Sequence, residues 1–205
     1  MARTTHHIAK GRSTHENYGI FRQRPPRRQQ RHFSAAGFRG IGKRGIETEL
    51  VQLAGEHPRG CIACYQCFKT KDGRCAVKDD CINDCIAKMR AADGILPASP
   101  TYFADVTSEI KALTDRAGMT ARANGDMLRR KVGAAVVAVR RGGAIHAFDS
   151  LNHFFLISQM IVPGSSYWNI AIGREIGDVK QDAEGLQTMK TLGENMAWLL
   201  KKIAD

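Results

Sequence analysis

The 205-residue sequence predicts an α/β fold in which a parallel sheet is covered by helices on both faces. From residue 46 onward, apolar stretches of strand length alternate with segments of helical periodicity. Two of the stretches, KVGAAVVAV (131–139) and MIVPGSSYW (160–168), have the apolar character of strands buried on both faces. Together these observations indicate a doubly wound sheet.

The expected elements follow in order along the chain. Strands are expected at 46–54, 95–100, 131–139 and 160–168, and helices at 79–94, 107–118, 146–159 and 184–205. Thr107 is expected to cap the second of these helices, with Glu109 in its first turn. Ligands of such sheets bind beyond the carboxyl ends of the strands. The loops SPTYF (99–103), RRGGAIHAF (140–148) and PGSSYWNIAIG (163–173) are therefore the places to look for a site.

The first 45 residues differ from the rest in charge and periodicity. The formal net charge is +11, and residues 1–45 hold eleven Lys and Arg side chains against one acid, Glu16, which leaves residues 46–205 close to neutral. The segment has no period of 2 or 3.6, so we expect a basic, disordered leader followed by one folded domain, 46–205. Nucleic-acid binding by the leader is the less expected alternative. A sheet opening at residue 46 would lack its usual first, central strand.

The sequence has no feature of a membrane or exported protein. No apolar run reaches the roughly 18 residues of a membrane helix, and MARTTHHIAKGR has no apolar segment of a secretory signal. We therefore expect a cytoplasmic protein, in which clustered cysteines indicate metal or redox use rather than a disulfide framework.

Four cysteines form a compact cluster. Cys61, Cys64, Cys67 and Cys75 have the spacing C-x2-C-x2-C-x7-C. Runs of thiolates at short steps hold iron–sulfur clusters, whereas zinc sites usually show two separated pairs. The spacing favours a [4Fe–4S] cluster, with zinc or metal-free thiols as alternatives.

Two further cysteines stand on an expected helix. Cys81 and Cys85 are four residues apart, so they share a face with Ile82 and Ile86. We expect small buried hydrophobes, with a spare ligand or redox partner as the alternative.

The loops and the cysteines together carry a family resemblance. The stretches are RGCIACYQCFKTKDGRCAVKDD, ADGILPASPTYFADVTSEIKALTDR, RRGG, VPGSSYWN and DAEGLQTMKTLG. In their order and spacing, residues 46–205 resemble the iron–sulfur flavoprotein branch of the flavodoxin-like NAD(P)H-dependent FMN reductase family. The resemblance implies a flavodoxin-like sheet of strand order 2-1-3-4-5, with FMN bound non-covalently at its carboxyl edge.

The resemblance also implies which residues hold the cofactors. The residues that would wrap the flavin ring are Ser99, Pro100, Thr101, Tyr102 and Phe103, and those that would approach its polar edge are Arg141, Gly142 and Gly143. Ordinary core packing is the alternative for the two aromatic residues. The metal ligands would be the four clustered cysteines.

The implied activity is that of an FMN-dependent oxidoreductase with a [4Fe–4S] cluster. Electrons would come from NAD(P)H or ferredoxin and pass to a small redox carrier. Flavin N5 does the hydride chemistry, so no catalytic acid or base is assigned. The resemblance further suggests a homodimer or homotetramer in which one subunit's cluster lies near a neighbour's flavin.

Two features depart from the family. Pro97 and Ala98 stand where glycine tends to precede Ser-Pro. Residues 1–45 contain no Gly/Ser-rich phosphate loop, and GFRGIGKR (37–44) is not a Walker motif, because Arg44 replaces the required Ser or Thr.

A shifted reading frame explains the missing loop. Codons can be chosen for HENYGIFRQ (15–23) that read MKIMVFSGS when translation starts one base later. The codons that follow can be chosen to continue this reading as APRDGNSAIL. The shifted segment would then be an apolar strand followed by a phosphate-binding loop. On this hypothesis the printed chain binds FMN poorly. The other alternative is a zinc-stabilised, non-enzymatic α/β binding module. His146, His153, Trp168 and Asn169 are not assigned, although the last two are positioned either to border the flavin or to end a strand.

Overall fold

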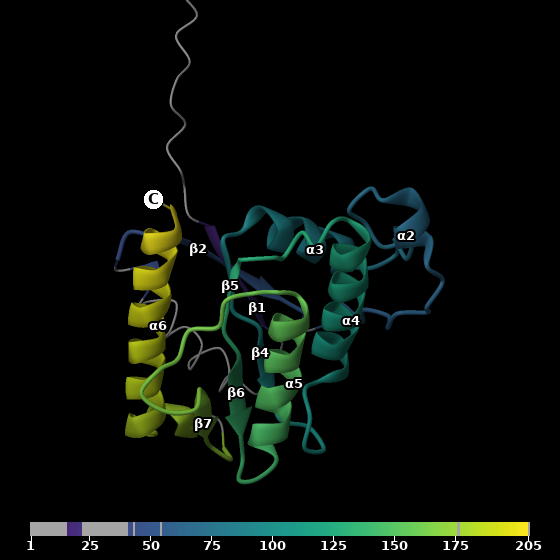
Figure 1. Cartoon of the computed structure of the whole chain (residues 1–205). Coiled ribbons are helices and arrows are strands. Elements are labelled where there is room, and N and C mark those ends of the chain that lie inside the picture. Colours follow the sequence, from purple (N-terminus) through teal and green to yellow (C-terminus); the bar gives the residue numbers. More distant parts are fainter. Residues whose placement is uncertain (1–15, 22–40, 43, 54, 176, 205) are drawn as a thin grey trace, which may run out of the picture.

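The computed structural model describes residues 16–21, 41–42, 44–53, 55–175 and 177–204. A seven-stranded parallel sheet forms its centre, with helices on both faces (Figure 1). The strands are β1 (Glu16–Phe21), β2 (Glu47–Gln52), β3 (Gly94–Ile95), β4 (Ala98–Pro100), β5 (Val132–Gly133), β6 (Val136–Val139) and β7 (Ile170–Ile172). The helices are α2 (Gln66–Thr70), α3 (Ile82–Ala91), α4 (Ser108–Ala123), α5 (Ala144–Ile157), the 3-10 turn η1 (Asp178–Lys180) and α6 (Ala183–Ala204).

The strand order confirms the predicted fold class. The sheet runs β5-β3-β1-β4-β6-β7, and β2 pairs with the other side of β1. Because β3 with β4 and β5 with β6 each form one interrupted strand, the sheet reduces to the order 2-1-3-4-5. Pro97 lies at the first interruption and cannot donate a hydrogen bond, although its carbonyl still accepts from Val136 N at 3.1 Å.

The expectation that the first strand is missing is wrong. β1 lies at the centre of the sheet, where Asn17 pairs with Thr48 on one side and with Gly94 on the other. Residues 16–21 have no alternation of apolar and polar residues that would predict a strand. Hydrogen-bonded pairing with strands on both sides is what makes this segment a strand. Residues 1–15 and 22–40, where the rest of the leader and a phosphate loop would fall, lie outside the described residues. Their predicted disorder stays a prediction.

Two hydrophobic clusters hold the layers together. α3, α4 and α5 pack on one face of the sheet through a cluster that includes Ile86, Ile110 and Phe155. On the opposite face, α6 packs through Met196 and its neighbours. The four predicted helices are confirmed, with boundaries shifted by a few residues.

The predicted strand at 160–168 is wrong. Ile161 makes only a single bridge, to Val132, and the strand that pairs with β6 is β7. The chain leaves the sheet at 162–169, where Pro163 has no N–H to donate and Gly164 O accepts from Asn195 Nδ2 of α6 at 2.9 Å. Residues 162–169 form one wall of a cavity.

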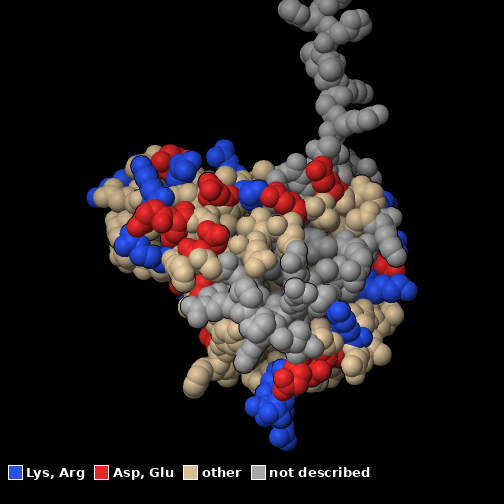
Figure 2. Space-filling model, turned by 180° about the vertical axis from the view of Figure 1, so that it is seen from behind, with Lys and Arg blue, Asp and Glu red and all other residues tan. Residues whose placement is uncertain are grey.

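The charges of the described surface are mixed. Figure 2 shows Lys and Arg interspersed with Asp and Glu among the described residues of the rear face. This distribution agrees with the near-neutral charge counted for residues 46–205. Among the described helices, none has the length and apolar character needed to cross a membrane.

Candidate functional site

Two loops meet at the carboxyl edge of the sheet. β4 and β6 are neighbours, and the loops that follow them hold the residues predicted to contact a flavin ring, except Ser99 and Pro100, which lie within β4. Thr101 N donates to Ala138 O at 2.8 Å, which continues the pairing one residue past β4. We call residues 101–105 and 140–143 the ring cradle.

The first loop contains a tight turn with a strained backbone. Tyr102 N donates to Asp105 O at 2.9 Å, and Asp105 N donates back to Tyr102 O at 3.2 Å. The two residues between them, Phe103 and Ala104, have φ of 47° and 65°. Non-glycine residues in the left-handed region cost about 1–2 kcal/mol each, and such strain is concentrated at ligand clamps. The turn holds the Phe103 ring fully in solvent and leaves Tyr102 45% exposed.

Buried polar groups hold this turn in place. Ser99 Oγ accepts from Thr107 N at 2.9 Å and donates to Pro100 O at 2.8 Å, so the loop is closed at its base. Asp105 accepts from Val106 N at 2.7 Å and from Ser150 Oγ at 2.9 Å. Partial burial alone would raise the pKa of Asp105, but these hydrogen bonds outweigh it and lower the pKa. Ser99 therefore supports the cradle from within the core, where it is fully buried.

The second loop approaches the first through glycine. Gly143 has φ of 84°, and a Cβ there would lie 2.8 Å from Ala104 Cα and 3.4 Å from Thr101 Cγ2. Gly142 has nothing within 4 Å of its Cβ position, and Arg141 is exposed. Gly143 is also the N-cap of α5 and supplies no side-chain cap. The first turn of α5, which begins beside the cradle, therefore has no side-chain acceptor from its cap.

The cradle fits the ring end of FMN. Thr101 Oγ1 is buried and has no hydrogen-bond partner among the described residues, which is costly unless a ligand supplies one. Exposed aromatic rings and open backbone at Gly142 suit a flat ring bearing carbonyls. Tyr102 and Phe103 are not core residues, so that alternative is wrong.

The cysteine loop, residues 61–75, lies on the outer side of α4 (Figure 1). It folds tightly, since Ala63, Tyr65 and Lys71 have φ between 50° and 54°. Cys61 and Cys64 are exposed, Cys67 is buried against Met119 O, and Cys75 is half-buried. Burial raises the pKa of Cys67, and the nearby charges of Cys75 and Cys64 contribute to the rise.

The donor set of this loop fits a thiolate-bound cluster. The four free thiols belong to one short loop, where the N–H of Phe68 is directed at the Cys67 sulfur, and closely spaced thiolates are the ligands that iron–sulfur clusters use. Thiolates around a single zinc would lie about 4 Å apart. In the described part of the chain, no three Cys, His, Asp or Glu side chains are gathered so as to hold one ion. The residues that would hold the cluster are those predicted: Cys61, Cys64, Cys67 and Cys75.

The other two cysteines belong to the core. Cys85 is 1% exposed, and burial raises its pKa to about 12. Burial also raises the pKa of the neighbouring Cys81. Both thiols therefore stay protonated at neutral pH, as expected of small hydrophobes.

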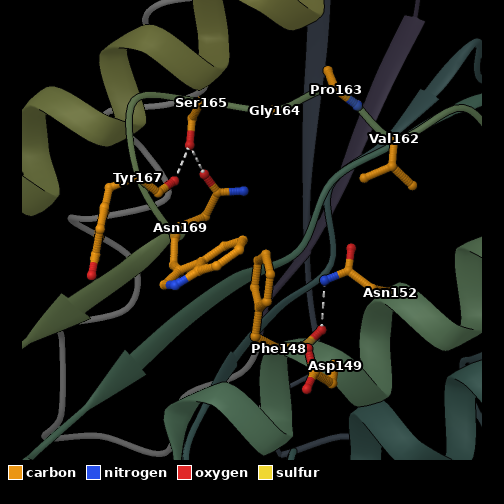
Figure 3. Close-up of a pocket in the computed structure, with 10 residues that line it drawn as sticks. Phe148, Asp149, Asn152, Val162, Pro163, Gly164, Ser165, Tyr167 and Asn169 are labelled. Carbon is orange, nitrogen blue, oxygen red and sulfur yellow. Dashed lines mark hydrogen bonds between the residues drawn. The ribbon is translucent and has the colours of Figure 1, made fainter.

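A cavity of about 660 Å³ lies between α5 and residues 162–169. The Phe148 ring of α5 contacts the Trp168 ring in a tilted arrangement, with the ring centroids 5.8 Å apart, and the Tyr167 ring lies 6.2 Å from Trp168. Figure 3 shows Asn169 and Ser165 on the opposite wall, where Ser165 Oγ donates to Asn169 Oδ1 at 2.6 Å. Sequence reasoning singled out Trp168 and Asn169 but not the α5 wall. The signal for that wall was the helical spacing of Phe148, Asp149 and Asn152.

The two unassigned histidines lie on α5. His146 Nε2 is 3.6 Å from Asp105 Oδ2 beside the cradle, and His153 is exposed.

Comparison with known proteins gives the family of this site. The family model described as NADPH-dependent FMN reductase matches residues 26–175. The chain belongs to this family. The match starts within the segment expected to be a leader, which extends the resemblance toward β1.

Within the NADPH-dependent FMN reductase family, the chain belongs to the iron–sulfur flavoprotein branch. It is 38% identical over 170 residues to an iron–sulfur flavoprotein of Methanocaldococcus jannaschii, which covers 80% of this chain and 86% of the relative. It is 34% identical over 169 residues to an iron–sulfur flavoprotein of Methanosarcina thermophila, with 78% and 82% covered. In fold it is similar to a flavodoxin, WrbA-like protein from Agrobacterium tumefaciens, with TM-score 0.66, 14% identity, and 92% and 98% of the chains covered. The flavodoxin-like fold, the family and FMN-dependent oxidoreductase activity are thereby established.

Proposed function

We propose that this FMN-dependent oxidoreductase is a cytoplasmic [4Fe–4S] flavoprotein that takes electrons from NAD(P)H or ferredoxin and delivers them to a small redox carrier. The observation that carries the proposal is the presence of four free thiols on one short loop of a chain that also forms the ring cradle at its sheet edge. The relatives named iron–sulfur flavoproteins support the same view.

Each part of the chain has a defined task in this proposal. FMN, when bound, supplies hydride chemistry at N5 and exchange of single electrons with a cluster. Thr101 would donate its free hydroxyl hydrogen to the ring, and the backbone at Gly142 and Gly143 would bind its carbonyl edge. Tyr102 and Phe103 would cover the ring from the strained turn.

The positions of the two sites support assembly into a homodimer or homotetramer. Thr107, at the base of the cradle, and Met119, beside Cys67, are twelve residues apart on one helix, or roughly 18 Å. A groove of about 570 Å³ between α4 and α5 includes Cys61 in its lining and also Ser150, which bonds Asp105 of the cradle. A neighbouring subunit seated on this side would bring its flavin closer to the cluster than the chain's own flavin is.

Anaerobic purification tests the proposal. We expect about four iron and four sulfide per chain, bound FMN, and bleaching of the flavin spectrum by NADH, NADPH or reduced ferredoxin. The donor that bleaches the spectrum fastest identifies the physiological class. A protein that contains zinc and takes up no iron on reconstitution would instead support the non-enzymatic binding module.

The composition of β1 favours a second hypothesis, the shifted frame. A central strand of a parallel sheet is normally apolar, but β1 is ENYGIF, with Glu, Asn and Gly that are depleted in strands. The shifted reading MKIMVF falls on the same residues and is apolar. Sequencing the gene across residues 15–44 decides the question, because stop codons in the shifted frame would end the hypothesis. If the frame is open, the shifted protein should bind FMN tightly and the printed chain should bind it poorly.

A further inference from the structure

A fully buried arginine stands behind the cysteine loop. Arg116 of α4 has no exposed surface. Burying a charge costs several kcal/mol unless the group is paired and hydrogen-bonded. Its side chain is satisfied entirely by residues that flank or belong to the loop: Arg59 O at 3.0 Å, Val77 O at 2.8 Å, Asp80 Oδ2, and Cys75 Sγ at 3.2 Å.

The carboxylate partner of this arginine is equally enclosed. The Asp80 side chain is 3% exposed, and it also accepts from Arg59 N at 3.0 Å and Ile82 N at 3.1 Å. The pair is thus held between α4 and the start of α3, with the two charges balancing each other. While the Nη atoms of Arg116 donate to Asp80 and to the two backbone carbonyls, its Nε–H donates to the Cys75 sulfur.

A different residue fixes the backbone of Cys75. Asn83 Oδ1 accepts from Cys75 N at 2.8 Å, and Asn83 Nδ2 donates to Cys75 O at 3.0 Å. Holding the backbone and contacting the sulfur are therefore separate tasks, done by separate side chains. Holding the loop in place would not require a charged donor directed at the Cys75 sulfur.

We propose that Arg116 is a positioning residue that orients Cys75 for the cluster and, through its N–H···S hydrogen bond, makes that cluster easier to reduce. The inference rests on the proposed function, since it requires the four cysteines to hold a cluster. Hydrogen bonds to ligand sulfur withdraw negative charge and so stabilise the reduced, more negative state. Asp80 acts through Arg116, because it fixes the guanidinium in the orientation that reaches the sulfur.

The test compares three variants of the full chain. D80N/R116Q removes both charges together and so avoids leaving a buried unpaired carboxylate. R116K keeps a positive charge near the sulfur, but the ammonium group of lysine cannot reproduce the planar set of N–H donors of the guanidinium. R122Q is the matched control, because Arg122 lies on the same helix but is exposed, where it donates to Ile157 O at 3.3 Å and pairs with Asp126 at 3.9 Å.

The measurements are iron and sulfide content, the midpoint potential from an anaerobic redox titration, and the rate of iron loss to a chelator. We expect D80N/R116Q to shift the midpoint to more negative potential and to lose iron about tenfold faster. R116K should lie between it and wild type, and R122Q should match wild type.

Two results would overturn the inference. One is an unchanged midpoint in D80N/R116Q with a full cluster; the other is faster iron loss without any shift of the midpoint in D80N/R116Q and R116K. Failure of the proposed function itself looks different, because wild-type protein would then take up no iron and sulfide at all.

Discussion

Gly143 lies so close to Ala104 that a Cβ on the glycine would be 2.8 Å from the Ala104 Cα. The loops after β4 and β6 thus touch backbone to backbone, and the cradle has its shape only while residue 143 is glycine. The φ of 84° adds a second reason for glycine at this position.

We therefore expect G143A to weaken FMN binding by at least about tenfold, because the added methyl displaces the turn at 102–105. Strain at this φ should also lower the free energy of unfolding by about 1–2 kcal/mol. Fluorescence titration with FMN and thermal denaturation measure the two effects. G60A is the control, since Gly60 lies outside the cradle and has nothing within 4 Å of its Cβ position, and equal losses in both variants would contradict the role given to the contact.

Thr101 should show opposite effects on stability and on binding. Its buried Oγ1 has no partner among the described residues, so T101V should raise the unfolding free energy of the FMN-free protein by about 1 kcal/mol. The same change should weaken FMN binding about fivefold, because the hydrogen bond to the ring is lost. Denaturant titration and FMN titration provide the two readings.

The control for Thr101 lies on α4. Thr120 Oγ1 is also buried and has no hydrogen-bond partner in the described part of the chain, but it lies outside the cradle. T120V should therefore stabilise the protein and leave FMN affinity unchanged. If T101V behaves like T120V in both assays, the Thr101 hydroxyl does not contact the flavin.

The six cysteines should divide into two classes. Serine at Cys61, Cys64, Cys67 or Cys75 should abolish most iron binding, because each would remove one thiolate ligand. Alanine at Cys81 should leave iron content at the wild-type level, since that thiol packs against the core beside Cys85. Iron and sulfide assays on anaerobically purified protein distinguish the classes, and loss of iron in C81A would make Cys81 a ligand.

Cys85 should make the protein less stable in alkali. Burial raises its pKa from 9.0 to about 12. The native state therefore keeps a proton that the unfolded state releases, and this contribution is fully present below pH 9. Between pH 9 and 12 the free energy of unfolding should therefore fall by about 1.4 kcal/mol per pH unit.

Denaturant unfolding of wild type and C85A between pH 8 and 11 measures this slope. C85A will be less stable at pH 8 because of the cavity it leaves, but its stability should decline less steeply with pH. Parallel curves for the two proteins would show that the Cys85 thiol ionises normally.

Much of the fold could be predicted from patterns that lie within single segments of the sequence. The capping residue of α4 is Thr107, whose hydroxyl accepts from Ile110 N at 3.5 Å as its sequence position predicts. The burial of Cys85 likewise follows from its helical spacing beside Ile82 and Ile86. Both depend on local geometry, which sequence periodicity reports directly.

Features that depend on distant segments were missed. β1 has no strand pattern of its own, and its place follows from pairing with β2 on one side and with β3 and β4 on the other. The last strand was expected at 160–168 but is β7. The chain leaves the sheet at Pro163 and Gly164, where Asn195 of α6 donates a hydrogen bond to Gly164 O.

By itself, the sequence determined the alternation of strands and helices, the quartet of closely spaced thiols and the loops in which flavin-binding residues are predicted. These are properties of short stretches, in which composition and spacing act through local geometry. Only the tertiary structure decided that Gly143 meets Ala104, that the Thr101 hydroxyl is buried without a partner among the described residues, and that Arg116 lies behind Cys75. Each of these contacts joins residues from separate elements, and only the packing of those elements brings them together.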